Sequence, residues 1–369
     1  MVVKVTTKRP YPNLLQDSPV PIATGYYNEV GEDQFMRAPV AAGPFKFVSQ
    51  EVNQSIVVAR FDDFWDEGRK ANFERLVMKA VPDETTRISG LQSGQLDVVQ
   101  GLSANGAEQL DGSGGIRIVT SESASLGFIQ MLDNRDDGPS PLKNLRVREA
   151  LLMAVDRQAI ADTLYKGYAQ VAATPMLTTT DGYDASFEPQ AYDPDRAKQI
   201  LAEEGAANLE LDLNSYSSSP SIPNVMKFVE AISGYWAKVG VKVNLTLDDN
   251  ATYVQKSYDQ AYDGASVFSI NGSFASELTG YVPYFTTDGI LTSHADTRFD
   301  DVLDKALATM DDGEREEYGR QLNELMRETL YVLPMVRFDN VMAIGPRVAE
   351  FRPKVATPIA EPFWYLEAE

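Results

Sequence analysis

The sequence predicts an α/β protein with two compact lobes. Two strand–helix–strand patterns, at residues 73–99 and 209–247, are well separated along the chain. Such a unit pairs two parallel strands, because the crossing helix returns the chain to the same end of the sheet. The chain has 369 residues, of which 43% are apolar, and this is enough to fill more than one hydrophobic core.

Strands are expected near the start of the chain. Val2–Thr6 predicts a strand that ends before the turn marked by Pro10 and Pro12. Alternating apolar residues at 44–47 and 55–61 then predict a hairpin. All of these segments show the alternation that is typical of half-buried strands.

The first strand–helix–strand unit follows. FERLVMKAV (73–81) predicts its first strand and Leu96–Val99 its second. Between them, Asp83 can cap a helix that runs through Gln92, and Gly94 supplies the left-handed end. We expect the two strands to pair in parallel.

The stretch NLRVREALLMAVDRQAI (144–160) predicts two successive helices. The spacing of one group of residues gives a single apolar helical face: Val147, Ala150, Leu151, Ala154 and Val155. Asp156 can then cap a second helix, 157–166, by accepting a hydrogen bond from one of its first amides. Arg146 and Arg148 lie off the apolar face, and we expect them to be solvated or ion-paired.

The second half of the chain shows the same kind of pattern. Asp193 and Pro194 mark the start of a helix that Gly205 ends. The further expected elements are a strand at 209–215, a helix at 223–240, a strand at 241–247, helices at 298–310 and 314–330, and a strand at YVLPMV (331–336). The unit at 209–247 therefore gives a second parallel pair.

Composition excludes several classes of function. The net charge is −21, from 54 acidic and 33 basic residues, which argues against binding nucleic acid or an anionic membrane by general electrostatics. The absence of cysteine excludes disulfides and thiolate chemistry. No apolar run approaches the about 20 residues of a membrane span, and MVVKVTTKRPYPNLLQ has no apolar segment of the kind found in a signal peptide.

Motifs for catalysis are mostly missing. The single histidine, His294, lies in an expected loop, where we predict a surface residue. No GxSxG or GxxxxGK[ST] motif occurs, so neither a serine-hydrolase elbow nor a P-loop is predicted. Adjacent acids leave a carboxylate-dependent hydrolase open as an alternative. These pairs are Asp136 and Asp137, Asp248 and Asp249, Asp300 and Asp301, and Asp311 and Asp312.

Several segments, taken in order, carry a resemblance to a known family. They are GPFKFVSQEVNQSIVVARFDDFW, PDETTRISGLQSGQLDVV, LKNLRVREALLMAVDRQAIADTLYKG, YDPDRAKQILAEEG and AISGYWAKVGVKVNLTLDD. Together they resemble the extracellular solute-binding proteins of ABC importers, in the oligopeptide, dipeptide and nickel class. The resemblance covers nearly the whole chain.

This resemblance implies a periplasmic-binding-protein-like fold, with two α/β lobes, a hinge and a cleft between the lobes. Such a receptor closes over a solute without covalent chemistry. The resemblance implies a monomer in the periplasm or at the cell surface that is not an enzyme and needs no cofactor or metal. Its partners would be a small-molecule solute and the permease of an ABC importer.

The resemblance also places the ligand contacts. AYDGASVFSINGSF (261–274) and SLGFIQM (125–131) are expected to line the cleft from two strands. The candidate contacts are Phe128, Gln130, Phe268, Ser269, Asn271, Phe274 and Arg337. For each aromatic residue, ordinary core packing is the alternative.

Departures from the family favour an uncharged ligand. Peptide-binding relatives carry an aspartate in the segment that corresponds to SINGSF, where this chain has Asn271 and Gly272. Where relatives hold a peptide carboxylate, only Lys256 is basic. Because an unpaired buried charge is expensive, a sugar or oligosaccharide is expected rather than a zwitterionic peptide.

Compared with the family, the chain looks incomplete at its amino end. We expect residues 1–40 to be a remnant of a small extra domain with connecting strands. Residues 41–124 and 341–369 would form an incomplete first lobe, and residues 125–340 the second, larger lobe. A truncated fragment that binds no solute is therefore a third hypothesis, beside the receptor and the hydrolase.

Overall fold

The computed structural model describes residues 4–8, 10–12, 22–135, 138–219, 221–271, 278–351 and 367–368. These residues divide between two compact units. The large unit contains Glu122–Asn340, and the small unit contains the described parts of Leu14–Ser121 and Val341–Val355. The chain passes between the units within two long strands, β5 (Arg117–Met131) and β10 (Val332–Ile344).

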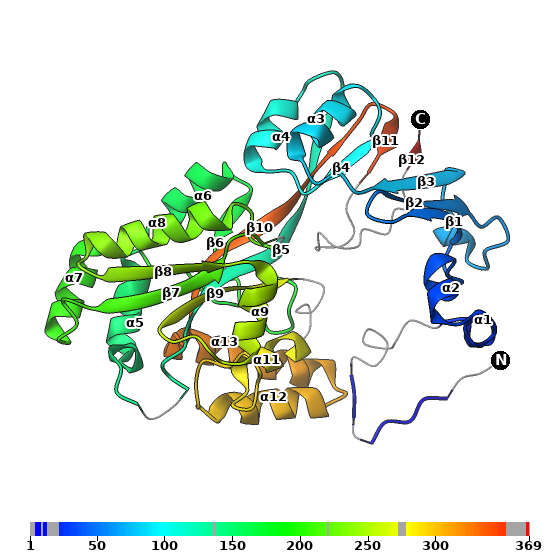
Figure 1. Ribbon diagram of the computed structural model, residues 1–369. Helices are drawn as coiled ribbons and strands as arrows, with labels where there is room; N and C mark the ends of the chain where they lie inside the picture. The colour runs from blue at the N-terminus through cyan, green and yellow to red at the C-terminus, as the bar shows by residue number, and fades with distance from the viewer. Residues whose placement is uncertain are drawn as a thin grey trace. The chain divides into compact units, whose positions relative to one another are not determined.

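The large unit is built on a mixed sheet whose strands lie in the order β6-β10-β5-β9-β7-β8 (Figure 1). The other strands are β6 (Ala169–Val171), β7 (Glu210–Tyr216), β8 (Lys242–Asp248) and β9 (Ala265–Asn271). β7 pairs in parallel with β8 and with β9, whereas β5 and β9 are antiparallel. The strand–helix–strand unit predicted at 209–247 is therefore confirmed, with α8 (Val225–Lys238) as its crossing helix.

Helices cover both faces of this sheet (Figure 1). They are α5 (Leu145–Met153), α6 (Arg157–Tyr165), α7 (Pro194–Glu203), α8, α9 (Asn250–Tyr258), α11 (Val282–Phe285), α12 (Arg298–Ala308) and α13 (Asp312–Thr329). On one face, the Trp236 indole of α8 donates to the Leu151 carbonyl of α5 at 2.9 Å. On the other face, Tyr253 of α9 and Tyr284 of α11 pack against the central strands.

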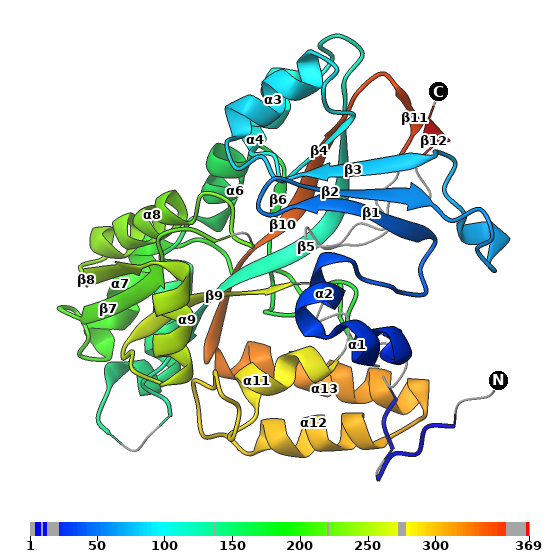
Figure 2. The ribbon, with the colours of Figure 1, turned by 45° about the vertical axis from the view of Figure 1, so that its right-hand side comes forward.

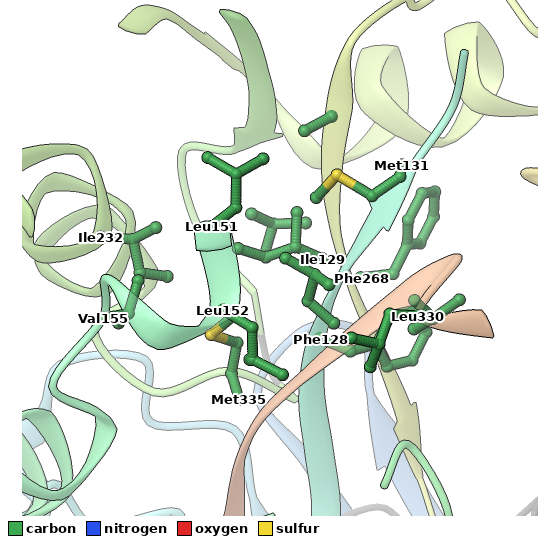
Figure 3. Packing of buried hydrophobic residues seen from close by; sticks show 14 of the residues in the cluster. Phe128, Ile129, Met131, Leu151, Leu152, Val155, Ile232, Phe268, Leu330 and Met335 are labelled. Atoms are coloured by element: carbon green, nitrogen blue, oxygen red, sulfur yellow. The ribbon is translucent and has the colours of Figure 1, made fainter. Parts of the chain in front are cut away.

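The core of the large unit therefore lies on both sides of the sheet. Figure 3 shows Ile129 and Met131 of β5 on the side of Leu151. Phe128 of the same strand lies on the opposite side, beside Phe268 of β9. This alternation follows from the two-residue period of a strand.

The helix pair predicted at 144–166 is confirmed. All five residues of the predicted apolar face are at most 1% exposed. Asp156 accepts a hydrogen bond from the Ala159 amide at 2.9 Å and so caps α6. Arg146 is ion-paired as expected, with Glu203 at 2.9 Å and Glu204 at 2.8 Å.

The prediction for Arg148 is wrong. The residue is 3% exposed, and no ion pair of the described residues includes it. Nε and Nη2 instead donate to the Thr329 carbonyl, and Nη1 donates to the Leu142 carbonyl at 2.7 Å. Burial lowers the pKa of Arg148 to about 10, so the group remains charged at neutral pH. The apolar pattern could not reveal this role, because Thr329 lies far away in the sequence.

Arg157 has a similar role at the start of α6. It is also 3% exposed. Nη1 donates to the carbonyls of Ala172 and Pro334 at 2.9 and 2.8 Å, and Nη2 donates to the Gln190 carbonyl at 2.6 Å. Burial lowers the pKa of Arg157 to about 10. These bonds satisfy carbonyl groups that would be costly to leave unpaired in the interior.

The small unit contains a separate antiparallel sheet of β1 (Phe45–Glu51), β2 (Ser55–Arg60) and β3 (Arg75–Lys79) (Figure 2). The predicted hairpin is thus confirmed and has a third strand. The other elements are α1 (Thr24–Val30), α2 (Glu32–Arg37), α3 (Glu84–Gln92), β4 (Val98–Gln100), α4 (Ala104–Leu110), β11 (Val348–Glu350) and β12 (Glu367–Ala368). Asp83 caps α3 as expected, by accepting from the Thr86 amide at 2.7 Å.

Two predictions for the first hundred residues fail. The strands expected to pair in parallel belong to different sheets, since β3 is antiparallel to β2 and β4 is antiparallel to β10. The local pattern located both strands and the helix between them, but it carries no information on a partner that lies elsewhere. The strand expected at Val2–Thr6 is absent at its described residues, 4–6.

Replacement of Arg148 by methionine should lower the free energy of unfolding by about 2–4 kcal/mol, because buried carbonyls lose their donors. Urea denaturation measures this change. Arg146→Met on the same helix is the control, and it should cost less than about 1 kcal/mol, since that ion-paired side chain is half-exposed. Equal losses in the two variants would contradict the structural role of Arg148.

Candidate functional site

The candidate contacts lie mainly where β5 and β9 pair. Phe128 stands opposite Phe268 in the register. Because side chains alternate along a strand, Phe128, Gln130 and Phe268 share one face of the sheet. Ser269 and Asn271 belong to the opposite face. The sheet therefore divides the expected contacts between its two sides.

Phe128 and Phe268 belong to a buried aromatic cluster. They are 1% and 5% exposed, with ring centres 6.4 Å apart. Tyr284 lies edge-on to Phe128 at 5.6 Å, and Tyr253 and Tyr216 lie 5.4 and 6.3 Å from Phe268. Sequence reasoning missed these tyrosines, because they come from three separate elements and no local pattern links them. Core packing accounts for most of the surface of both phenylalanine rings.

Gln130 is fully buried on the same face. Its Nε2 donates to the Leu291 carbonyl at 2.7 Å, whereas its Oε1 has no partner. The side chain borders a hollow that is also lined by Ser266, Phe268 and Thr292 and has room for about one water molecule. Such a hollow is too small for a solute.

Ser269 and Asn271 are half-buried on the opposite face. Asn271 is the last residue of β9, so its side chain lies at the end of the strand. Phe274 lies outside the described residues. Of the contacts expected in 261–274, Ser269 and Asn271 thus keep more exposed surface than Phe268 does.

Arg337 lies on β10, where it stands opposite Gln170 of β6. It is 9% exposed. Nη1 donates to the Tyr183 hydroxyl at 2.6 Å, and Nη2 lies 3.4 Å from Oε1 of Gln170. Within the described part of the chain, the buried Nε has no partner. No ion pair of the described residues includes this guanidinium group.

The segment before Tyr183 is fixed to α13. Gly182 has φ +82°, and a Cβ atom there would collide with the backbone of Gly319 and Arg320. Asp181 forms an ion pair with Arg315 at 2.9 Å. The backbone next to Tyr183 is therefore held in place by contacts that only a glycine at 182 permits.

Most of the adjacent acids have structural roles. Asp249 caps α9 by accepting from the Thr252 amide at 3.1 Å, and Asp311 caps α13 by accepting from the Glu314 amide at 2.9 Å. Asp300 accepts from the Thr287 amide at 2.8 Å. Asp136 and Asp137 lie outside the described residues.

Asp248 is occupied by two neighbours. The Tyr262 hydroxyl donates to it at 2.6 Å and Lys256 at 2.9 Å, and these bonds hold the pKa of Asp248 below its usual range. Lys256, the base considered for a ligand carboxylate, is thus already ion-paired. Within the described ranges, histidine and acidic side chains form no group of three that could hold a metal ion.

The surface prediction for His294 is wrong. It is 1% exposed, and its ring centre lies 4.5 Å from that of Phe299 and 4.6 Å from that of Tyr331. Nδ1 accepts from the Asp296 amide at 3.2 Å, and no described residue pairs with Nε2. Burial lowers the pKa of His294 to about 4, so the ring is neutral at pH 7. The polar sequence TSHADT gave no sign of its aromatic neighbours.

Comparison with known proteins adds information on the family. Residues 1–291 match the model of the bacterial extracellular solute-binding proteins, family 5 (middle region). Heme-binding protein A of Haemophilus influenzae is 27% identical over 336 residues, which are 89% of this chain and 58% of that protein. Di/tripeptide-binding protein 3 of Pseudomonas aeruginosa is 23% identical over 335 residues, which are 89% of this chain and 62% of that protein. The chain spans about three fifths of the length of these relatives.

Solved structures share the fold. HbpA2 from Haemophilus parasuis matches 98% of this chain and 72% of its own, with a TM-score of 0.82 at 23% identity. NikA from Brucella suis, in complex with Fe(III)-EDTA, matches 98% of this chain and 76% of its own, with a TM-score of 0.83 at 22% identity. The expected periplasmic-binding-protein-like fold class is therefore confirmed.

The buried His294 predicts a pH dependence of stability. Its folded pKa of about 4 lies below the ordinary 6.5, so the unfolded chain binds a proton first as the pH falls. Stability from this group is thus complete above about pH 7 and is lost between about pH 6.5 and 4, by about 2.5 kcal/mol at pH 4.5. Urea unfolding at pH 7.5, 5.5 and 4.5 measures the loss. His294→Phe, which keeps a ring in the aromatic cluster, should remove this part of the dependence, and parallel curves for the two proteins would contradict the assignment.

Proposed function

The chain belongs to family 5 of the bacterial extracellular solute-binding proteins, and we propose that it captures a small polar solute and delivers it to an ABC importer. The match of residues 1–291 to the family model carries this proposal. The resemblance expected from the sequence is confirmed, and the family is one of binding proteins rather than enzymes. Each of the two units is proposed to be a lobe of the receptor.

The solute contacts are proposed to include Ser269, Asn271 and Arg337 in the large unit. Their support is chemical: all three are polar, and Ser269 and Asn271 are half-buried rather than enclosed. Phe128 and Phe268 would contact a solute only with the small part of their rings that stays exposed. Gln130 would require the small hollow beside it to widen. Phe274 completes the proposed set from outside the described residues.

The proposed ligand class is broader than the sugar or oligosaccharide expected from the sequence. The relatives are named for heme and for di- and tripeptides, and those names lend no support to a sugar preference. Lys256, whose isolation favoured an uncharged ligand, is paired with Asp248. We therefore propose a small polar solute. Neither the names of the relatives nor Lys256 specifies its charge.

The proposed place of action is outside the cytoplasm, in the periplasm or at the cell surface, as the family description suggests. The proposed partner is the permease of an ABC importer, and the receptor would act as a monomer. None of the helices in the described ranges has the length and apolar character that crossing a bilayer requires.

A carboxylate-dependent hydrolase is the alternative that the acidic pairs suggested. Asp249 and Asp311 cap helices, Asp300 holds a loop amide, and Asp248 is bound by a lysine and a tyrosine. A general acid or base needs a lone pair or proton available to substrate. In these four aspartates the carboxylates are already engaged in hydrogen bonds within the protein. A truncated fragment without binding activity is the other alternative, which a binding test separates from the receptor.

A thermal-shift screen of di- and tripeptides, heme, nickel chelates and sugars should find a compound that raises the melting temperature. A ligand bound only by the folded state stabilises it by about 2.7 kcal/mol at one hundred times its dissociation constant. Calorimetry then measures affinity, and mass spectrometry of the recovered compound checks that it is unchanged. Failure of the whole panel would support the fragment hypothesis, and turnover of a glycoside or ester would support the hydrolase.

Asn271→Ala should weaken binding of the compound found in this screen by about 5- to 30-fold, the loss expected for about 1–2 kcal/mol of hydrogen bonding. Asn244→Ala is a matched control, because that asparagine lies on β8 and donates to the exposed Asp212. Both variants should melt near the temperature of the unmodified protein. Unchanged affinity in Asn271→Ala would remove this residue from the site.

A further inference from the structure

We infer that Arg337 binds an anionic group of the solute, a carboxylate or a similar oxyanion. This inference rests on the proposed function and adds the charge of the ligand to it. The residues that carry it, Arg337, Gln170 and Tyr183, all belong to the large unit.

The large unit offers a comparison among three buried arginines. Arg148 and Arg157 are each 3% exposed, and each donates at least three hydrogen bonds to backbone carbonyls. Arg337, at 9% exposed, donates to no backbone carbonyl within the described chain and keeps a buried Nε without a partner. A role in holding the fold explains the first two side chains and does not explain the third.

The unpaired Nε and the weakly bonded Nη2 of Arg337 form one edge of the guanidinium group. Nε and Nη2 point in the same direction and can bind both oxygens of a carboxylate side by side. In this chain, the same edge of Arg298 holds the Asp296 carboxylate, with Nε–O distances of 2.9 and 3.1 Å and an Nη2–O distance of 2.5 Å. Among the described residues, this edge of Arg337 has one hydrogen-bond partner, Gln170, whose oxygen lies 3.4 Å from Nη2, long for a hydrogen bond.

The other end of the group is anchored. Nη1 donates to the Tyr183 hydroxyl at 2.6 Å, and the guanidinium carbon lies 5.6 Å from the centre of the tyrosine ring. The contact of Gly182 with Gly319 fixes the chain next to this tyrosine. Arg337 is therefore oriented before any ligand arrives, which lowers the entropy that binding must overcome.

Solvent has access to the neighbours of Arg337. Gln170 is exposed and Tyr183 is half-buried, so an oxyanion that displaces the Gln170 side chain can reach the Nε–Nη2 edge. This edge lies on the Phe128 face of the sheet, whereas Ser269 and Asn271 lie on the other face. A Cβ atom on Gly127 would touch Phe338, which places Phe338 on the face opposite to Phe128. Arg337, the preceding residue, then points to the face of Phe128.

The electrostatics favour an anion. A buried cation without a counter-charge is costly, and an oxyanion at this edge offsets that cost through two charge-assisted hydrogen bonds. A hydroxyl group or an amide of an uncharged sugar supplies no charge. The solute class that fits is therefore a small polar molecule with an acidic group, such as an acidic sugar derivative or a peptide with a free carboxyl end.

Calorimetric titration of three acid and neutral pairs tests this inference: Ala-Phe and its amide, gluconate and glucose, and succinate and succinamide. At least one acid should bind the unmodified protein more tightly than its neutral counterpart. Arg337→Gln should lower the binding affinity for that acid by about 10- to 100-fold, the range expected for a charged hydrogen bond. Arg337→Lys should lower this affinity by less. Arg320→Gln is the control. It removes an equal charge from the surface of α13, where Arg320 pairs with Glu316 and Glu317, and it should leave the affinity for the acid unchanged.

Two further readouts separate a ligand contact from a structural role. In protein labelled with ¹⁵N-arginine, the Nε–H signal that disappears in Arg337→Lys should move when the acid is added. The melting temperature of Arg337→Gln should equal or exceed that of the unmodified protein, unlike the fall expected for Arg148→Met. A comparable fall would overturn the inference.

Equal affinity of acids and neutral counterparts, in the unmodified protein and in Arg337→Gln, would also overturn the role of Arg337 while leaving the proposed receptor intact. If none of the six compounds binds and the Nε–H signal stays in place, the inference fails as well. The broader thermal-shift screen, which includes heme and nickel chelates, then decides the fate of the proposed function separately.

Discussion

An arginine side chain carries five N–H donors, and when the side chain is buried these donors need hydrogen-bond acceptors within the protein. The large unit depends on this constraint. Arg148 ties the start of α5 to the end of α13 through the Thr329 carbonyl. Arg157 ties the start of α6 to the Pro334 carbonyl in β10. In each case the cation joins segments that are distant in the sequence, and backbone carbonyls take the place of carboxylates.

The same constraint distinguishes Arg337, whose buried Nε has no acceptor among the described residues. The surrounding sheet also explains why the other expected contacts are so unlike one another. Alternation along β5 and β9 sends Phe128 and Phe268 into an enclosed aromatic cluster, and it sends Ser269 and Asn271 to the opposite face. A sequence segment that contains both kinds of residue thus contributes at once to the core and to a half-exposed polar surface.

Local signals in the sequence predicted local structure well. The caps at Asp83 and Asp156, the apolar stripe of α5 and the β7–α8–β8 unit all follow from residues close together in the chain. Properties that depend on distant partners were not predictable. The partner of β4 is β10, the neighbours of His294 are Phe299 and Tyr331, and the acceptor of Arg148 is Thr329. For the candidate ligand contacts, the sequence located the strands that carry them. The burial of each side chain and the face of the sheet on which it lies depend on residues far away in the chain.

The close approach of Gly182 to Gly319 links two positions that no local pattern connects. Neither position tolerates even a methyl group, since it would meet the backbone of the other segment. A change in the middle of α13 would therefore push on the turn that carries Tyr183, and through it on the guanidinium of Arg337. Replacing both glycines would add a second clash rather than relieve the first, so both positions should remain glycine in natural variants of this chain. A single replacement at Gly319 would thus shift the position of Arg337 from a residue that does not touch it.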